Sequence, residues 1–313
     1  MSVEQGASRA VRVDAHQHFW DPTTADYPWM SDAPDVVRRP YGPDDLTPLL
    51  AAARIDATVV VQARLSMDET RALLRTAAEV DAVAGVVGWV DLTAGDVARS
   101  VAELRGGPGG TRLVGLRHHA NEEPDPRWLC RPDVIRGLRL AAQAGLCFDL
   151  LVWPRELPAA LDLAAMVPEV RLVLDHMGKP AVRDGLDGGW ERAIRGLGAL
   201  GNVSVKLSGI VTEVADRWSV DDLRPFVDVV LEAFGPDRTM FGSDWPVCLA
   251  ATTYGGWLAG AEALTAALSD AERADVFGET ARRVYGLALP PGRPRRGQRD
   301  QPTCSAGSPG PAA

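Results

Sequence analysis

Histidine is scarce in this 313-residue chain, and its five copies lie in or beside short apolar segments. His16 and His18 form an H-x-H pair in VRVDAHQH, and residues i and i+2 of a strand project to the same side. Such a pair suits two ligands of one metal ion or two donors to one substrate oxygen, with packing as the alternative. Asp14 has the same parity and is expected to orient one imidazole.

Two more groups end apolar segments of their own. Asp244 lies in FGSDWPV, where a carboxylate could bind a metal ion or take a proton from water. Because Pro246 follows closely, a turn or helix-cap role is the alternative for Asp244. His176 lies in LDHMGKP, with a purely structural histidine as its alternative. Both residues are nevertheless expected to be catalytic, together with His16 and His18.

A second set of residues is expected to bind substrate. Arg117 in GLRHH is suited to hold an anionic or carbonyl oxygen. Since consecutive strand residues face opposite ways, His118 cannot share a direction with both Arg117 and His119. Lys206 lies within the apolar VSVKLSG, where a charged amine needs a partner or a function. The other members of the predicted substrate-binding set are Gln62, Arg64, His118, Trp153 and Trp245.

Eight apolar segments are the elements that must position these groups. They begin 25 to 46 residues apart and cover residues 11–18, 57–63, 83–92, 113–120, 146–152, 171–178, 203–209 and 239–247. Runs this apolar, without strict alternation, are typical of parallel strands buried on both faces. Helical patterns lie between them, which predicts a single (β/α)8 barrel with its chemistry at the carboxyl ends of the strands. An open doubly wound sheet is the alternative, but no glycine-rich dinucleotide motif follows the first strand.

Local helix signals support this alternation. Leu223, Phe226, Val227, Val230, Leu231 and Phe234 give a helical stripe that ends at Gly235. Ser66 with Glu69, and Ser269 with Glu272, have the spacing of capping boxes.

The domain organisation follows from the same pattern. We expect a flexible N-terminus over residues 1–10, the barrel over 11–289, and a disordered Pro/Gly/Arg-rich tail over 290–313. The connection after the first strand is long and aromatic, and it is interpreted as an active-site lid.

Composition excludes several classes of function. The chain is 46% hydrophobic and 24% charged, as in globular proteins, and its net charge of −9 disfavours non-specific nucleic-acid binding. No apolar run approaches the roughly 20 residues of a membrane span, and no export signal is visible. With four widely spaced cysteines, the chain is expected to be cytoplasmic with reduced thiols. A homodimer is favoured only by the general frequency of symmetric dimers.

The motifs VDAHQHFWDP, VVVQAR, GVVGWVDL, GLRHH, LDHMGKP, VKLSG and FGSDWPVC together resemble the amidohydrolase-2 branch of the amidohydrolase superfamily. Within that branch they are similar to the sugar-lactonase-like group, over about residues 11–287. The resemblance implies a barrel that hydrolyses the ring ester of a lactone. It implies Asp244 as the base for water, His16, His18 and His176 around the carbonyl, and Arg117 with Lys206 among the substrate-binding groups.

The chain departs from the metal-dependent relatives of the wider superfamily. Those relatives use a bridging carbamylated lysine or a glutamate from strand four and a histidine from strand five, whereas strand five here offers Asp149 without a histidine. A binuclear centre is therefore not expected. One Zn²⁺ held by His16, His18 and Asp244 and a metal-free site are both compatible with the sequence.

Three functions follow for testing. The first is hydrolysis of a small lactone, a sugar-acid lactone or a related carboxylated one, by water that Asp244 activates. The second is a metal-dependent amidohydrolase or decarboxylase of the same branch. The third belongs to another class, a barrel that binds a small ligand without turnover.

Overall fold

The computed structural model describes residues 9–31, 33–214 and 217–289. The predicted tail over 290–313 and most of the predicted flexible N-terminus therefore lie outside the described residues. At the start of the described chain, Arg9 donates two hydrogen bonds to the carboxylate of Asp56, at 2.6 and 2.7 Å.

Eight parallel strands form one sheet in the order β1 to β8, so every strand pairs with its neighbours in the sequence. Their bounds are β1 Val13–Gln17, β2 Ala57–Val61, β3 Val83–Gly88, β4 Leu113–His118, β5 Cys147–Leu150, β6 Leu172–Leu174, β7 Val203–Leu207 and β8 Thr239–Phe241. Each lies within one of the eight predicted segments. The predicted (β/α)8 class is confirmed, and the strands are shorter than the apolar runs that contain them.

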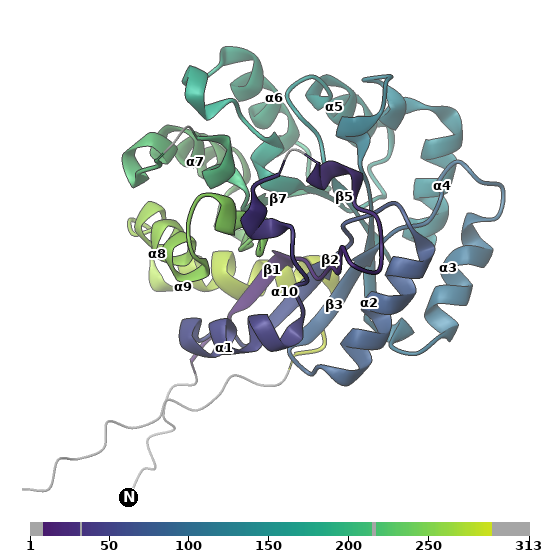
Figure 1. Ribbon diagram of the computed structural model, residues 1–313. Helices are drawn as coiled ribbons and strands as arrows, with labels where there is room; N and C mark the ends of the chain where they lie inside the picture. Colours follow the sequence, from purple (N-terminus) through teal and green to yellow (C-terminus); the bar gives the residue numbers. More distant parts are fainter. Residues whose placement is uncertain (1–8, 32, 215–216, 290–313) are drawn as a thin grey trace, which may run out of the picture.

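Hydrogen bonds beyond β8 join the last strand to the first. A parallel bridge pairs Gln17 with Trp245, the Asp244 N–H donates to the His16 carbonyl at 2.8 Å, and the His18 N–H donates to the Trp245 carbonyl at 2.7 Å. The strands therefore form a nearly closed barrel (Figure 1). These bonds are made by the backbone of His16, His18 and Asp244. Closure of the barrel therefore brings the residues that follow β8 next to those at the end of β1.

Helices surround the strands (Figure 1). Their bounds are α1 Pro43–Ala53, α2 Met67–Glu79, α3 Val97–Gly106, α4 Pro132–Gln143, α5 Leu157–Met166, α6 Gly188–Gly198, α7 Val220–Phe234, α8 Tyr254–Leu264, α9 Asp270–Ala274 and α10 Thr280–Tyr285. Ala281 and Tyr285 of α10 and the following Leu287 pack in one buried cluster with strand residues such as Val59 and Met240. The last helix therefore closes the barrel at the end opposite to its histidines.

The capping signals are confirmed in one case and in part in another. Ser269 and Glu272 form the full capping box of α9. Ser66 accepts from the Glu69 N–H, but the Glu69 carboxylate accepts instead from the backbone of Ala63 and Arg64 at 3.0 and 2.8 Å. Glu69 therefore fixes the loop that follows β2.

The connection from β1 to α1 crosses in front of the strands in Figure 1. It contains two short 3-10 turns, Pro28–Met30 and Asp35–Val37, and an antiparallel bridge between Trp20 and Tyr41. The Trp29 indole donates to the Ala63 carbonyl at 3.0 Å, so the connection is fastened to the end of β2. That it acts as a moving lid stays a prediction.

Within the described residues no helix is long and apolar enough to cross a membrane. Cys130, Cys147 and Cys248 are free thiols, and Cys304 lies outside the described residues.

Candidate active site

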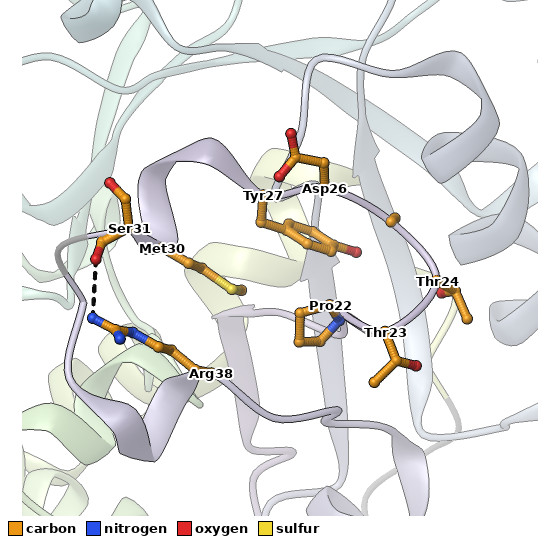
Figure 2. A pocket seen from close by; sticks show the side chains of 9 residues that line it. Pro22, Thr23, Thr24, Asp26, Tyr27, Met30, Ser31 and Arg38 are labelled. Atoms are coloured by element: carbon orange, nitrogen blue, oxygen red, sulfur yellow. Dashed lines mark hydrogen bonds between the residues drawn. The ribbon is translucent and has the colours of Figure 1, made fainter.

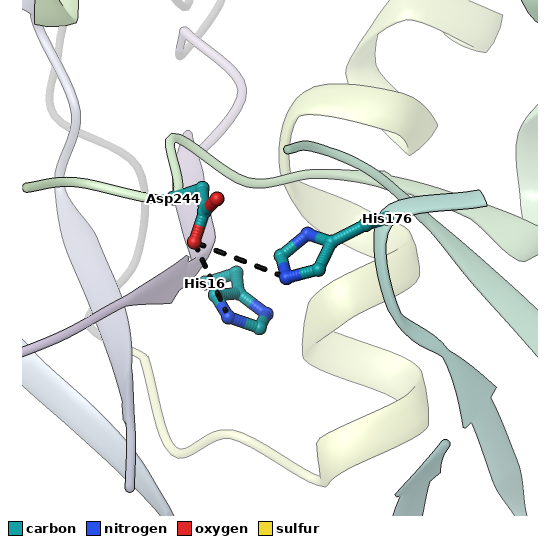
Figure 3. Close-up of side chains that lie close together, drawn as sticks. All are labelled: His16, His176 and Asp244. Atoms are coloured by element: carbon teal, nitrogen blue, oxygen red, sulfur yellow. Dashed lines mark ion pairs between the residues drawn. The ribbon is translucent and has the colours of Figure 1, made fainter. Parts of the chain in front are cut away.

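Three of the predicted catalytic side chains meet at one point, as Figure 3 shows. His16 comes from β1, His176 follows β6, and Asp244 follows β8. Asp244 Oδ1 lies 3.7 Å from His16 Nε2 and 3.9 Å from His176 Nε2. All three side chains are almost completely buried. All three therefore lie at the ends of strands, where the sequence predicted the candidate groups.

His18 joins this group from the same strand. Its Nδ1 lies 2.8 Å from the Val61 carbonyl, which can only accept, so the Nδ1 proton is held there. His18 Nε2 lies 3.1 Å from His16 Nε2 and 3.4 Å from Asp244 Oδ1. The two imidazoles of the H-x-H pair share one side of the strand, as predicted.

Asp14 was expected to orient an imidazole, but its carboxylate has other partners. The pairing register of β1 shifts between Asp14 and Gln17. The Asp14 carboxylate accepts from the backbone N–H groups of His16 and Ser243, at 3.2 and 2.8 Å, and from the Tyr254 hydroxyl at 3.0 Å. Asp14 therefore fixes the backbone where β1 meets β8 and does not orient an imidazole.

His176 is held by a turn with unusual backbone angles. His176 and Met177 have backbone φ angles of 53° and 54°, which residues other than glycine adopt at a cost of about 1–2 kcal/mol each. The turn aims the ring into the barrel, where His176 Nδ1 lies 2.9 Å from Ser208 Oγ. Gly209, at φ 65°, makes room for it, because a Cβ there would lie 2.4 Å from His176 Nδ1. Asp244 has a positive φ of 55° as well.

Burial and neighbouring charges set the protonation of the group. Burial lowers the pKa of His176 to about 4, and burial together with the Lys206 ammonium lowers the pKa of His16 well below its usual range. Burial alone raises the pKa of Asp244, but attraction to His176 and a hydrogen bond from His18 outweigh it and hold that pKa below its ordinary value. At neutral pH the ionised Asp244 carboxylate therefore lies beside the neutral imidazoles of His16 and His176.

A buried ionic network lies directly behind the histidines. The Lys206 ammonium is fully buried and lies 2.6 Å from Asp149 Oδ2, 3.0 Å from Asp175 Oδ1 and 3.0 Å from His16 Nδ1. The Tyr285 hydroxyl donates to Asp149 Oδ2 at 2.8 Å. The contacts of Lys206 with Asp149 of β5 and His16 of β1 join strands that are not neighbours in the sheet, so the network fills the barrel interior. Lys206 has the charged partners that its sequence position demanded.

Arg117 connects this network to the site. Its Nη1 donates to Asp175 Oδ2 at 3.0 Å and lies 3.4 Å from His16 Nε2, and its Nη2 donates to the Gln62 carbonyl. Burial would raise the pKa of Asp175, but Lys206 and His16 outweigh it and hold that pKa well below its usual range. Arg117 and Lys206 are therefore neutralised by Asp175 and Asp149.

A cavity of about 340 Å³ opens above these groups. It is lined by His18, Trp20, Trp29, Ala63, Arg117, His119, Asn121, Glu122, Leu151, Trp153, His176, Lys179, Asp244 and Val247. Of the predicted residues, the lining includes His18, His176, Asp244, Arg117 and Trp153. Arg117 and His119 both face it, which agrees with the alternation expected for β4.

The other predicted substrate-binding residues make contacts within the protein. The His118 ring stacks on Trp128 with 4.0 Å between centroids, and Trp245 packs edge-on against Tyr41 at 5.2 Å. Arg64 lies over the Tyr27 ring. Gln62 and Lys206 are fully buried among protein groups. Contact of these five side chains with substrate stays a prediction.

Sequence reasoning missed Asp175, Asn121 and Glu122. Asp175 carried a signal, because it lies two residues beyond the inward-facing Val173 of β6 and so shares its direction. Asn121 and Glu122 lie in the short 3-10 turn Ala120–Glu122, where no periodicity indicates direction.

A second hollow, of about 590 Å³, lies within the β1–α1 connection (Figure 2). It is lined by Pro22, Thr23, Thr24, Ala25, Asp26, Tyr27, Met30, Ser31 and Arg38. The Arg38 guanidinium donates to the Ser31 carbonyl at 3.0 Å. No histidine lies among its described lining residues, whereas His18, His176 and Asp244 line the smaller cavity.

The site suits one divalent metal ion. One ligand atom from each of His16, His176 and Asp244 lies within 4.8 Å of the others. This trio contains His176 where the predicted trio contained His18, whose Nε2 lies 3.4 Å from Asp244 Oδ1. Neutral imidazoles with an ionised carboxylate are the ligands that Zn²⁺ prefers, so the residues present fit such an ion.

Comparison with known proteins gives consistent matches. The family model described as Amidohydrolase matches residues 13–287. L-fucono-1,5-lactonase of Burkholderia multivorans (strain ATCC 17616 / 249) is 43% identical over 293 residues, which cover 90% of this chain and 98% of that protein. L-fucono-1,5-lactonase of Burkholderia ambifaria is 38% identical, with 90% and 97% covered. A crystal structure of an amidohydrolase from Burkholderia multivorans with bound Zn has a TM-score of 0.84 at 42% identity, covering 89% of this chain and 100% of that one.

Proposed function

This chain belongs to the amidohydrolase family, and we propose that it opens the ring ester of a sugar-derived lactone with water that Asp244 activates. The observation that carries the proposal is the Asp244 carboxylate, ionised and facing the cavity beside neutral histidines. Two relatives that match nine-tenths of the chain are named L-fucono-1,5-lactonase, which supports a lactone as substrate.

The arrangement of groups supports an addition–elimination reaction. Asp244 takes a proton from water, and the water oxygen forms a bond to the ring carbonyl carbon. Negative charge develops on the carbonyl oxygen, where the Arg117 guanidinium, which lines the cavity, stabilises it. The bond from carbon to the ring oxygen then breaks, and the leaving oxygen takes up the proton that Asp244 removed from water.

His176 serves this last step as a proton relay. With its pKa lowered to about 4 by burial, it starts the reaction neutral and cannot supply a proton of its own at pH 7. Its Nε2 lies 3.9 Å from Asp244 Oδ1, so it can accept the proton from Asp244 and pass it to the ring oxygen. The water is thereby consumed, and a hydroxy acid is the product.

A metal ion would be held by His16, His176 and Asp244, with His18 beside them. When bound, such an ion polarises a carbonyl or lowers the pKa of water. The stabilisation of charge on the carbonyl oxygen by Arg117 belongs to the chain itself.

The test is hydrolysis of L-fucono-1,5-lactone, followed with a pH indicator in weak buffer. We expect Asp244→Asn to lower the rate by about 10²–10⁴-fold, the range for loss of a general base. Asp26→Asn is the matched control, because Asp26 is an exposed carboxylate in the other hollow. An Asp244→Asn protein as active as the control would refute the assignment.

Metal analysis of the same preparations separates the alternatives. Stoichiometric Zn²⁺ with loss of activity on chelation, combined with turnover of amides or carboxylates and not of lactones, would favour the metal-dependent alternative of this branch. Lactone that raises the melting temperature but is recovered unchanged after long incubation would favour the binding barrel.

A further inference from the structure

One wall of the active-site cavity is formed by three residues that directly follow β4. His119, Asn121 and Glu122 belong to a single turn and line the same cavity as Asp244 and His176. The reaction described above uses none of them. Their hydrogen-bonding groups show what this wall, here called the β4 wall, is built to contact.

The position of the His119 proton follows from its neighbour Gln62. Gln62 Nε2 donates to the Arg117 carbonyl at 3.1 Å, which fixes the amide so that its Oε1 faces His119 Nε2, also at 3.1 Å. His119 Nε2 must therefore donate. Burial lowers the pKa of His119, a hydrogen bond with Glu122 opposes that shift, and its Nδ1 faces the Glu122 carboxylate.

Two acceptors follow in the same turn. Glu122 Oε1 is 3.3 Å from His119 Nδ1, and a hydrogen bond with His119 lowers the pKa of Glu122, so His119 holds this carboxylate in its ionised form. Asn121 Oδ1 is buried and has no hydrogen-bond partner among the described residues. The β4 wall thus presents the ionised, half-exposed carboxylate of Glu122 and the buried Asn121 Oδ1, whose donor is expected from a ligand because buried polar atoms rarely stay unpaired.

The cations around the cavity are already paired. Lys179 Nζ lies 2.6 Å from Glu213 Oε1, and Arg117 Nη1 lies 3.0 Å from Asp175 Oδ2. Among the described residues only His119 lies within ion-pair distance of the Glu122 carboxylate, and Asp244 adds a second negative charge to the same cavity. A substituent that is itself a carboxylate would therefore meet repulsion at this wall.

We propose that Glu122, together with His119 and Asn121, determines substrate specificity: the β4 wall accepts hydrogen bonds from neighbouring hydroxyls of an uncharged sugar lactone and rejects lactones that carry a carboxylate. The proposal rests on the proposed function, and it selects one of the two substrate classes that the sequence left open. Trp153 lines the cavity, is 47% exposed as a residue, and supplies an apolar surface for the carbon face of such a sugar.

The test compares three lactones, namely L-fucono-1,5-lactone, unsubstituted δ-valerolactone and the carboxylated 2-pyrone-4,6-dicarboxylate. For Glu122→Gln we expect the ratio of kcat/KM for the sugar lactone to that for δ-valerolactone to fall about 10-fold, mainly through KM. The ratio for the carboxylated lactone to δ-valerolactone should rise. Asn121→Leu, which removes an acceptor without changing charge, should lower only the first ratio.

Glu123→Gln is the matched control, because Glu123 is the next residue and bonds His118 at 2.7 Å outside the cavity lining. Unaltered ratios in Glu122→Gln, or equal changes in Glu122→Gln and Glu123→Gln, would overturn the role of the β4 wall.

Failure of the wall and failure of the proposed function give different results. Hydrolysis of δ-valerolactone that Asp244→Asn abolishes supports the function whatever Glu122→Gln does. If no lactone is hydrolysed, the proposed function is refuted. The role of the β4 wall is then tested by calorimetry, which measures binding of L-fucono-1,5-lactone to Asp244→Asn. We expect the added Glu122→Gln to weaken that Kd about 10-fold, and an equal Kd would refute the wall.

Discussion

Gly209 controls how closely the end of β7 approaches His176, and Gly209→Ala tests the geometry of the site. A Cβ at this position would lie 2.4 Å from His176 Nδ1 and 2.5 Å from its Cγ. Ordinary contacts begin at 3.4 Å, so the imidazole must move by about 1 Å. That movement pulls Nδ1 away from Ser208 Oγ, which lies 2.9 Å from it.

Two effects of this substitution can be separated by their size. Alanine at φ 65° destabilises the fold by about 1–2 kcal/mol, because a Cβ crowds the carbonyl in the left-handed region. Displacement of a reacting group by about 1 Å lowers the rate on the order of 10²-fold. The first effect belongs to any glycine with this backbone, and only the second depends on His176.

Gly145→Ala is the control that isolates the second effect. Gly145 has φ 78°, and nothing lies within 4 Å of the Cβ that alanine would add. Urea unfolding should show both variants less stable by about 1–2 kcal/mol. Only Gly209→Ala should lose about 10²-fold in kcat for the lactone.

A Gly209→Ala enzyme with the kcat of Gly145→Ala would refute the idea that His176 must lie where it does. If Gly209→Ala unfolds, Ser208→Ala gives the answer without a clash, because it removes the hydrogen bond to Nδ1 and leaves the backbone unchanged. We expect it to lower kcat at an unfolding free energy close to that of the unmodified protein.

Two further predictions concern the buried charges. Lys206→Met leaves Asp149 and Asp175 buried without their ammonium and should cost about 3–5 kcal/mol in urea unfolding. Lys179→Met breaks a partly exposed pair with Glu213 and should cost about 1 kcal/mol or less, so equal losses would contradict the network. Burial lowers the pKa of His176 to about 4, so its neutral form contributes stability that is present above the unfolded pKa of 6.5 and is lost as the pH falls toward 4. His176→Gln should therefore lose about 2 kcal/mol less than the unmodified protein between pH 7 and pH 5, and identical pH slopes in denaturant titrations would show that His176 is not buried neutral.

Much of the fold could be predicted from the sequence. Apolar segments separated by helical patterns predicted eight strands, and each predicted segment contains one. The alternation of side chains along a strand placed His16 with His18, and Arg117 apart from His118. The burial of Lys206 in an apolar strand predicted that charged partners exist. All of these signals are local, because they depend on residues within one strand.

The partners themselves were decided by tertiary structure. Asp149 and Asp175 meet Lys206 only because the barrel brings β5, β6 and β7 around one axis. The register shift in β1 turned Asp14 toward Ser243 and Tyr254, a change that strict alternation could not reveal.

The same division holds for the substrate cavity. The sequence by itself determined which residue types stand at the strand ends. Whether Glu122 or Lys206 faces the cavity was settled by loop conformation and by closure of the sheet. A sequence pattern carries periodicity along one element, whereas hydrogen-bond partners and cavity walls depend on register between elements far apart in the chain.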